Sequence, residues 1–283
     1  MSLFKIHANT PALTALNSIY RSSNNIAVHQ ARLASGKRIN TAKDDSAGYA
    51  IARSLEQRAQ GLRGALSNVR NAKSILSIAE GGYQAQMDVL LTIKGKTVQA
   101  ADSSLSSEQR TAVRNQVREL LNEVDDISSQ AKWNGNDIFG STFSFHVGAD
   151  KDDKLAVAMT ASTSAKVGGD TSADLSSMGA TGGTYSIEDE TKSALAIGAV
   201  DTAIQALATV IQGIGDTIIR LGLKSDALSI TAANTEATRS MYEDADMAQE
   251  QIEFLKHQIV QQTGISALSH ANSSPQIVLS LFR

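Results

Sequence analysis

The sequence predicts a mainly α fold: an elongated antiparallel helical bundle with coiled-coil character, its N- and C-terminal helices paired, and a small β-hairpin region. Three observations predict this. Proline occurs only at Pro11 and Pro275 of 283 residues, so the interior lacks helix breakers. Hydrophobic residues make up 42% but aromatic residues only 4%, a composition that suits close helix packing. Both ends carry apolar stripes whose members are spaced alternately three and four residues apart.

The terminal stripes are the strongest of these signals. The N-terminal stripe contains Leu13, Leu16 or Asn17, Tyr20, Asn24, Ala27, Ala31 and Ala34. The C-terminal stripe contains Met241, Ala245, Ala248, Ile252, Leu255 and Ile259. A helix with such a stripe needs partner helices to cover it. We therefore expect the ends to pair with each other and with copies of themselves.

The first helix is expected within residues 1–35, with Gly36 as its stop. A polar connector over 36–44 follows, and Asp44 or Asp45 supplies the N-cap oxygen of a second helix of about 50 residues. The apolar positions of that helix run from Leu55 to Leu90 in steps of three and four.

A third helix is expected over roughly Ser107–Lys132, ended by the turn dipeptide Asn134-Gly135. Two short alternating runs follow, at 142–147 and 155–159, separated by an acidic loop. This pattern predicts a β-hairpin, which is the only strand pair the sequence indicates.

Residues 160–190 are rich in Ser, Thr and Gly without periodicity, which predicts an exposed loop or an irregular cap. A fourth long helix begins near Thr191. Its apolar positions alternate in steps of three and four from Ile197 to Ala232.

Overall charge and cysteine content exclude several classes of function. The net charge of −3 and a pI near 6.0 argue against nucleic acid as a main partner. Cysteine is absent, so there is neither a disulfide framework nor a thiolate metal site. Because no uninterrupted run of 18 apolar residues occurs, we expect no membrane insertion. The N-terminus lacks the apolar stretch of a cleaved secretory signal.

The two ends differ in charge. Residues 1–60 contain eight basic and three acidic residues, whereas residues 236–283 contain six acidic and three basic ones. This asymmetry has two interpretations: the charges lie on two solvated helix faces, or they guide the ends together as charges flanking a coiled-coil seam do.

No pattern of residues indicates catalysis. The histidines (His7, His29, His146, His257 and His270) are scattered, and neither an HExxH motif nor a P-loop occurs. The acidic run Asp150, Asp152 and Asp153 lacks the glycine and the closing glutamate of a calcium loop. We therefore predict no catalytic, metal or cofactor site and no enzymatic activity.

Several long stretches near the two ends are distinctive. At the C-terminal end these are AANTEATRSMYEDADMAQE (232–250) and the segment from QIVQQTG to the last residue, and at the N-terminal end it is LNSIYRSSNNIAVHQARLASGKRINTAKDDSAGYAIA (16–52). These stretches resemble bacterial flagellin. WNGNDIF (133–139) and FHVGAD (145–150) are similar to its small hairpin region. The resemblance covers nearly the whole chain except roughly 160–190, as in a minimal flagellin.

The resemblance implies an organisation and a function. Residues 1–44 and 236–283 would form an inner coiled-coil layer, 45–163 and 190–235 an outer helical bundle with the hairpin, and 164–189 a short surface remnant of the variable region. The implied function is that of a structural subunit of the flagellar filament, for swimming motility. The alternative is a hook–filament junction protein, which shares the terminal seams but usually not the full set of motifs.

The resemblance also implies contacts. The inner subunit interface would contain Leu13, Leu16, Tyr20, Ala27, Ile252, Leu255, Ile259, Ile277 and Leu281. The partners would be further copies of the chain, an export chaperone and the export gate, and the filament cap and hook-junction proteins. The protein would be extracellular, exported by the flagellar type III apparatus without a cleaved signal peptide.

Two surface features are expected on the same basis. Many flagellins carry an LQRVRELAVQ-like stretch that a Toll-like receptor of animal hosts recognises. The matching run here contains Leu90, Thr92, Gly95 and Val98 and lacks the central Arg and the Glu of that stretch.

The short middle segment has two interpretations: it carries O-linked glycans, as in some flagellins, or it is a plain solvated loop. The candidate O-glycosylation residues are Ser162, Thr163, Ser164, Thr171, Ser172, Ser176, Ser177, Thr181 and Thr184.

Overall fold

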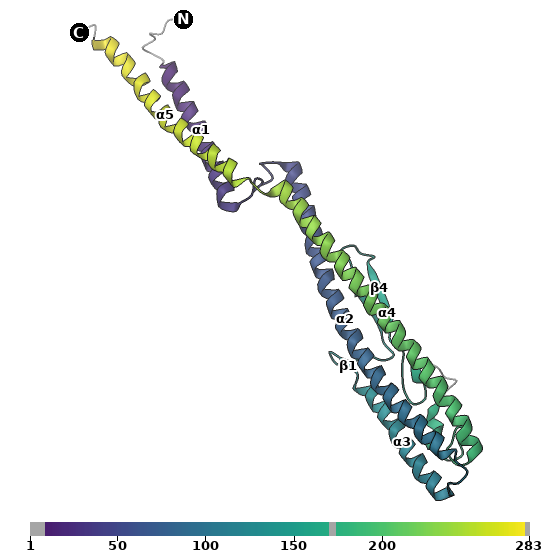
Figure 1. Cartoon of the computed structure of the whole chain (residues 1–283). Helices are drawn as coiled ribbons and strands as arrows, with labels where there is room; N and C mark the ends of the chain where they lie inside the picture. Colours follow the sequence, from purple (N-terminus) through teal and green to yellow (C-terminus); the bar gives the residue numbers. More distant parts are fainter. Residues whose placement is uncertain (1–8, 170–173, 281–283) are drawn as a thin grey trace. The chain divides into compact units, whose positions relative to one another are not determined.

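The computed structural model describes residues 9–169 and 174–280, with side chains described up to residue 273. The described part is mainly helical, as predicted (Figure 1). Its α-helices are α1 (Thr10–Ser35), α2 (Ser46–Ala100), α3 (Ser107–Gln130), α4 (Glu190–Glu243) and α5 (Met247–Ser280).

The chain divides into two compact units. The first contains Met1–Ala59 and Ala233–Arg283, and the second contains Gln60–Ala232. The sequence placed the limits of the inner pair at 44 and 236, whereas the first unit takes in the beginning of α2 as far as Ala59. Helices α2 and α4 thus contribute residues to both units.

In the first unit, α1 and α5 lie side by side and antiparallel (Figure 1). The side chain of Asn9 accepts a hydrogen bond from the Ala12 amide at 3.1 Å and caps the start of α1. Gly36 ends this helix in the left-handed conformation, with φ 72°, and its amide donates to the Arg32 carbonyl. Asp45 caps α2 by accepting from the Ala47 and Gly48 amides. The predicted stop and the second of the two predicted caps are confirmed.

The connector after α1 is attached to the end of α4. The Arg38 amide donates to the Glu243 carbonyl at 2.7 Å, and the Ala245 amide donates to the Gly36 carbonyl at 3.0 Å. Ile39, in the middle of this polar connector, is buried. Backbone pairing therefore joins segments about two hundred residues apart in the sequence.

The second unit has a continuous apolar core to which α2, α3 and α4 contribute. Fully buried members include Leu76 and Leu90 of α2, Val117 of α3, and Leu207 of α4. Tyr83 also lies in this core. Its ring stacks on Phe139 with 4.1 Å between ring centroids, its hydroxyl donates to the Thr160 carbonyl, and its burial raises the pKa of the phenol.

The predicted hairpin is confirmed as β3 (Thr142–His146) paired antiparallel with β4 (Lys154–Ala158). A second strand pair was missed. It joins β1 (Lys132–Trp133) to β2 (Asn136–Asp137) across the predicted turn, in which Asn134 and Gly135 both have positive φ. The expectation of a single strand pair was therefore wrong. The second pair could not be found from the sequence because strands of two residues are too short to show an alternating pattern.

The Ser/Thr/Gly-rich segment folds as an irregular cap. It contains the short 3₁₀ helices η1 (Val167–Gly169) and η2 (Leu175–Gly179). Four of its apolar side chains are fully buried in the core of the second unit: Val167, Leu175, Met178 and Ile187. Of the two predicted alternatives, an exposed loop or an irregular cap, the described part of the segment is the cap, because single apolar residues can anchor an irregular segment without any periodicity.

One described helix, α4, has an 18-residue window with a mean hydropathy of 1.8, which is sufficient in length and composition to cross a membrane. The core helix of a water-soluble unit has the same composition. Val200, Leu207 and Leu221 of α4 are fully buried in the second unit, whereas only 28% of the apolar window is buried. Core packing therefore accounts for only part of its apolar character.

Candidate functional site

The contact between α1 and α5 is made largely of small and polar residues. The inward positions of α1 are Ala12, Ala15, Ile19, Ser22, Ile26, His29 and Leu33, and those of α5 are Glu250, Phe254, His257, Gln261, Gly264, Leu268 and Ala271. Hydrogen bonds cross it in the middle and at one end of the pair. The Ser22 hydroxyl donates to the His257 carbonyl at 2.7 Å, and the Asn9 amide group donates to the Ala271 carbonyl at 2.8 Å.

The stripes predicted from the sequence lie elsewhere on these helices. Ile259 and Glu250 are nine residues apart, or two and a half turns, so they lie on opposite sides of α5. Leu13 and Ser22 have the same separation on α1. The interpretation that these stripes pair the two ends was therefore wrong. The two helices contact each other through the inward positions given above, which have the same three-and-four spacing. The apolar stripes face away from this contact.

The outward stripes are well exposed. Exposed fractions are 57% for Leu13, 62% for Tyr20, 64% for Ile252 and 63% for Ile259. Leu16, Leu255 and Ala27 are exposed as well, whereas the side chains of Ile277 and Leu281 lie outside the described residues. Single exposed aliphatic residues are ordinary, but a row of them along a helix marks an interaction surface.

Ion pairs join the two ends of the chain across the first unit. Lys37 Nζ lies 2.6 Å from Glu243 Oε1, and Arg32 Nη1 lies 3.2 Å from Glu250 Oε1. The other oxygen of Glu250 lies 2.5 Å from His29 Nδ1. These pairs join the basic N-terminal segment to the acidic C-terminal one, which agrees with the interpretation that opposite charges guide the ends together.

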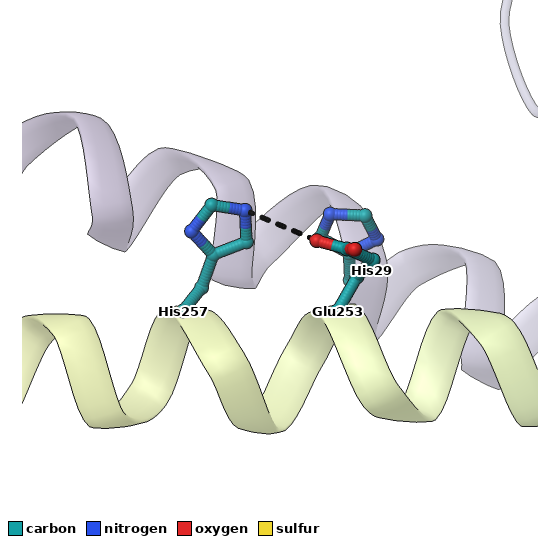
Figure 2. Close-up of side chains that lie close together, drawn as sticks. All are labelled: His29, Glu253 and His257. Carbon is teal, nitrogen blue, oxygen red and sulfur yellow. Dashed lines mark ion pairs between the residues drawn. The ribbon is translucent and has the colours of Figure 1, made fainter.

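A cluster of His29, Glu253 and His257 lies beside these ion pairs. Glu253 and His257 project from the same face of α5, and His29 comes from α1 (Figure 2). The two imidazole rings are stacked with 5.5 Å between centroids. Lys256 hydrogen-bonds to Glu253 at 3.0 Å, which lowers the pKa of this carboxyl group. The sequence showed only the four-residue spacing on α5, because the third member is distant in the chain.

The receptor-like stretch on α2 is partly inside the molecule. Leu90 is fully buried in the core of the second unit. Thr92, Gly95 and Val98 are exposed. Only these last three of the predicted positions are accessible to a partner.

Two of the candidate O-glycosylation residues are not accessible. Ser162 is fully buried, and its hydroxyl oxygen accepts from the Gly168 amide. Ser164 is also buried, and its hydroxyl donates to Asp125 at 2.7 Å. The remaining described candidates are Thr163 and Ser177, which are partly exposed, and Ser176, Thr181 and Thr184, which are exposed. Thr171 and Ser172 lie outside the described residues.

Gly264 sets the close approach of α5 to α1. A Cβ atom at this position would lie 2.9 Å from Ile19 Cγ1. We expect Gly264→Ala to weaken the helix pair by about 1–3 kcal/mol, measured as faster hydrogen exchange in α1.

Gly213→Ala on α4 is the matched control for this change, because no atom would lie within 4 Å of its new Cβ. There we expect the stability of the helix to rise by about 0.5–1 kcal/mol. Equal effects of the two changes would contradict this role of Gly264.

Comparison with known proteins gives consistent matches along the chain. Residues 6–144 match the family described as bacterial flagellin N-terminal helical region, and residues 197–282 match the bacterial flagellin C-terminal helical region. The "Flagellar filament 33 kDa core protein" of Treponema phagedenis is 30% identical over 98% of this chain and 99% of its own length. A "Flagellin" of Halalkalibacterium halodurans is 28% identical over the same shares.

Among solved structures, a putative flagellar hook-associated protein from Vibrio parahaemolyticus is similar in fold. The TM-score is 0.57 at 15% sequence identity, and the match covers 71% of this chain and 99% of that one. At this identity the likeness concerns the fold alone.

Proposed function

The chain belongs to the bacterial flagellin family, and from this membership we infer that it is a structural subunit of the flagellar filament. The observation that supports this most directly is the pair of outward apolar stripes on α1 and α5. The two helices already cover their inward faces with each other, so the stripes have no partner among the described residues of the same chain. A filament provides one, since each subunit is surrounded by further copies.

The energetics favour association through these stripes. Removing one aliphatic side chain of this size from water is worth roughly 1.5–3 kcal/mol. Several such side chains in each subunit are enough to offset the loss of translational and rotational freedom on association. We propose that the stripes of one copy meet different surfaces of the next copy, which makes the contacts heterologous, and heterologous contacts that do not close produce an open helical polymer.

A hook–filament junction protein is the alternative. The relatives named above are a filament core protein and a flagellin that match over nearly their whole length, whereas the hook-associated likeness is one of fold. Mass spectrometry of filaments sheared from the source cells distinguishes the two roles. We expect this chain to be a major component of the sheared material, and traces alone would favour the junction role.

The finer parts of the function follow from the family. We propose that the filament serves swimming motility and lies outside the cell, and that the subunit is exported by the flagellar type III apparatus without a cleaved signal peptide. The partners during export and growth would be a chaperone, the export gate, the filament cap and the hook-junction proteins. The chain would act by packing, without catalysis or a cofactor required for assembly.

The receptor-like stretch leads to a separate prediction. Thr92 and Gly95 stand where many flagellins have an Arg and a Glu, and both positions are exposed here. Without these charges, charge-assisted hydrogen bonds to a receptor are lost. We expect weak or absent activation of the Toll-like receptor in a reporter-cell assay, and a gain of signal from the double change Thr92→Arg with Gly95→Glu. Strong activation by the unmodified chain would contradict the prediction.

A further inference from the structure

We propose that His29, Glu253 and His257 form a binding site for a divalent transition-metal ion of the Zn²⁺ class between α1 and α5. One ligand atom from each of the three side chains lies within 4.8 Å of the other two. Two imidazole nitrogens and one carboxylate oxygen are a ligand set that Zn²⁺ accepts, with a water molecule in the fourth position. The site is independent of the polymerisation proposed above.

Both helices contribute to the arrangement of the ligands. Glu253 and His257 are four residues apart on α5, which places them next to each other on one helix face. His257 Nε2 and Glu253 Oε2 are 4.0 Å apart. His29 approaches from α1, so a bound ion would have ligands from both ends of the chain (Figure 2). An ion bound in this way would link the two helices across their polar contact.

The carboxylate of Glu250 orients His29, which is the ligand that α1 provides. His29 Nδ1 is 2.5 Å from Glu250 Oε2, while Arg32 holds the other oxygen of Glu250 at 3.2 Å. When Nδ1 donates to this carboxylate, the lone pair of Nε2 is free for a metal ion. A histidine ligand whose other nitrogen donates to a carboxylate is the usual arrangement in protein zinc sites.

Two adjustments are needed for the ion to bind. In tetrahedral coordination at about 2.1 Å, ligand atoms lie roughly 3.4 Å apart, so the side chains must close by about an ångström. Glu253 must also exchange its hydrogen bonds with Lys256 for the metal. Lys256 is 60% exposed, and an exposed pair on one helix contributes little to stability, so this exchange costs little.

The test is equilibrium dialysis of the full-length chain against ZnCl₂, with the bound metal measured by elemental analysis. We expect one Zn²⁺ per chain for the wild-type protein, and an affinity at least tenfold weaker for His29→Asn and for His257→Asn. His270→Asn is the matched control, because His270 is exposed on the same helix and outside the cluster. Its affinity for Zn²⁺ should equal that of the wild type.

A second measurement separates loss of a ligand from loss of folding. Far-UV circular dichroism without metal should show the same helix content in all variants. Added Zn²⁺ should slow hydrogen exchange over 22–33 and 250–261 in the wild type but not in His257→Asn. Absence of stoichiometric binding by the wild type, or equal affinity in the wild type and in both cluster variants, would overturn the proposal.

Discussion

A chain reduced to residues 41–243 will remain monomeric at concentrations at which the full-length chain polymerises. The truncation removes α1 and α5, and with them both outward stripes. It keeps the whole of Gln60–Ala232, the unit that contains the continuous apolar core. The proposed role of the stripes thus assigns folding and association to different parts of the chain. Analytical ultracentrifugation and electron microscopy measure the loss of assembly.

Circular dichroism provides the control for the truncated chain. Because the core of the second unit is intact, the fragment should remain helical and unfold cooperatively on heating. A fragment that is folded and monomeric agrees with the proposed role of the terminal helices. Filaments formed by the folded fragment would show that the assembly contacts lie in the second unit.

Replacing Ile259 by Asp will block polymerisation of the full-length chain while leaving its helix content unchanged. Ile259 is 63% exposed on the side of α5 opposite α1, so the change affects little packing within the chain. In an assembled interface, however, the same change would place an unpaired charge in an apolar contact. We expect the critical concentration for assembly to rise at least tenfold, measured by sedimentation of polymer across a protein dilution series.

Gln258→Asp is the matched control for this change. Gln258 is the preceding residue, is exposed, and lies outside the stripe, so the control introduces the same side chain into the same turn of α5. It should assemble at nearly the wild-type concentration. Similar inhibition by both changes would mean that added negative charge, rather than loss of the apolar stripe, prevents assembly.

Most of the local structure was predictable because it depends on local chemistry. Long runs without proline and with three-and-four spacing form helices, the glycine at 36 adopts the left-handed conformation that ends α1, and an aspartate caps α2. The hairpin was predictable for the same reason, since alternation over five residues and a polar loop are both readable in sequence.

The choice of helix face was not predictable in the same way. On α1 and α5, two sets of residues share the three-and-four spacing, and hydrophobicity favours the set that includes Leu13 and Ile259. That set faces outward, while the inward set contains Ser22, His29 and Gly264. Periodicity shows that a helix needs a partner but does not show whether the partner is in the same molecule.

Two features that depend on specific tertiary contacts were missed. The buried anchors of the irregular segment, such as Leu175 and Ile187, have no periodic neighbours. The cluster at His29 and His257 joins residues more than two hundred positions apart, and only the pairing register of α1 with α5 brings them together. No local pattern contains that register.

The central claim is that the outward stripes of α1 and α5 are the contacts between subunits. A cryo-electron microscopy reconstruction of the polymer at side-chain resolution tests it most directly. The account predicts that Leu13, Tyr20, Ile252 and Ile259 are buried against neighbouring copies, while Ser22 and His257 remain in contact within one chain. A reconstruction in which those four side chains face solvent, with the subunits joined through the second unit, would contradict it.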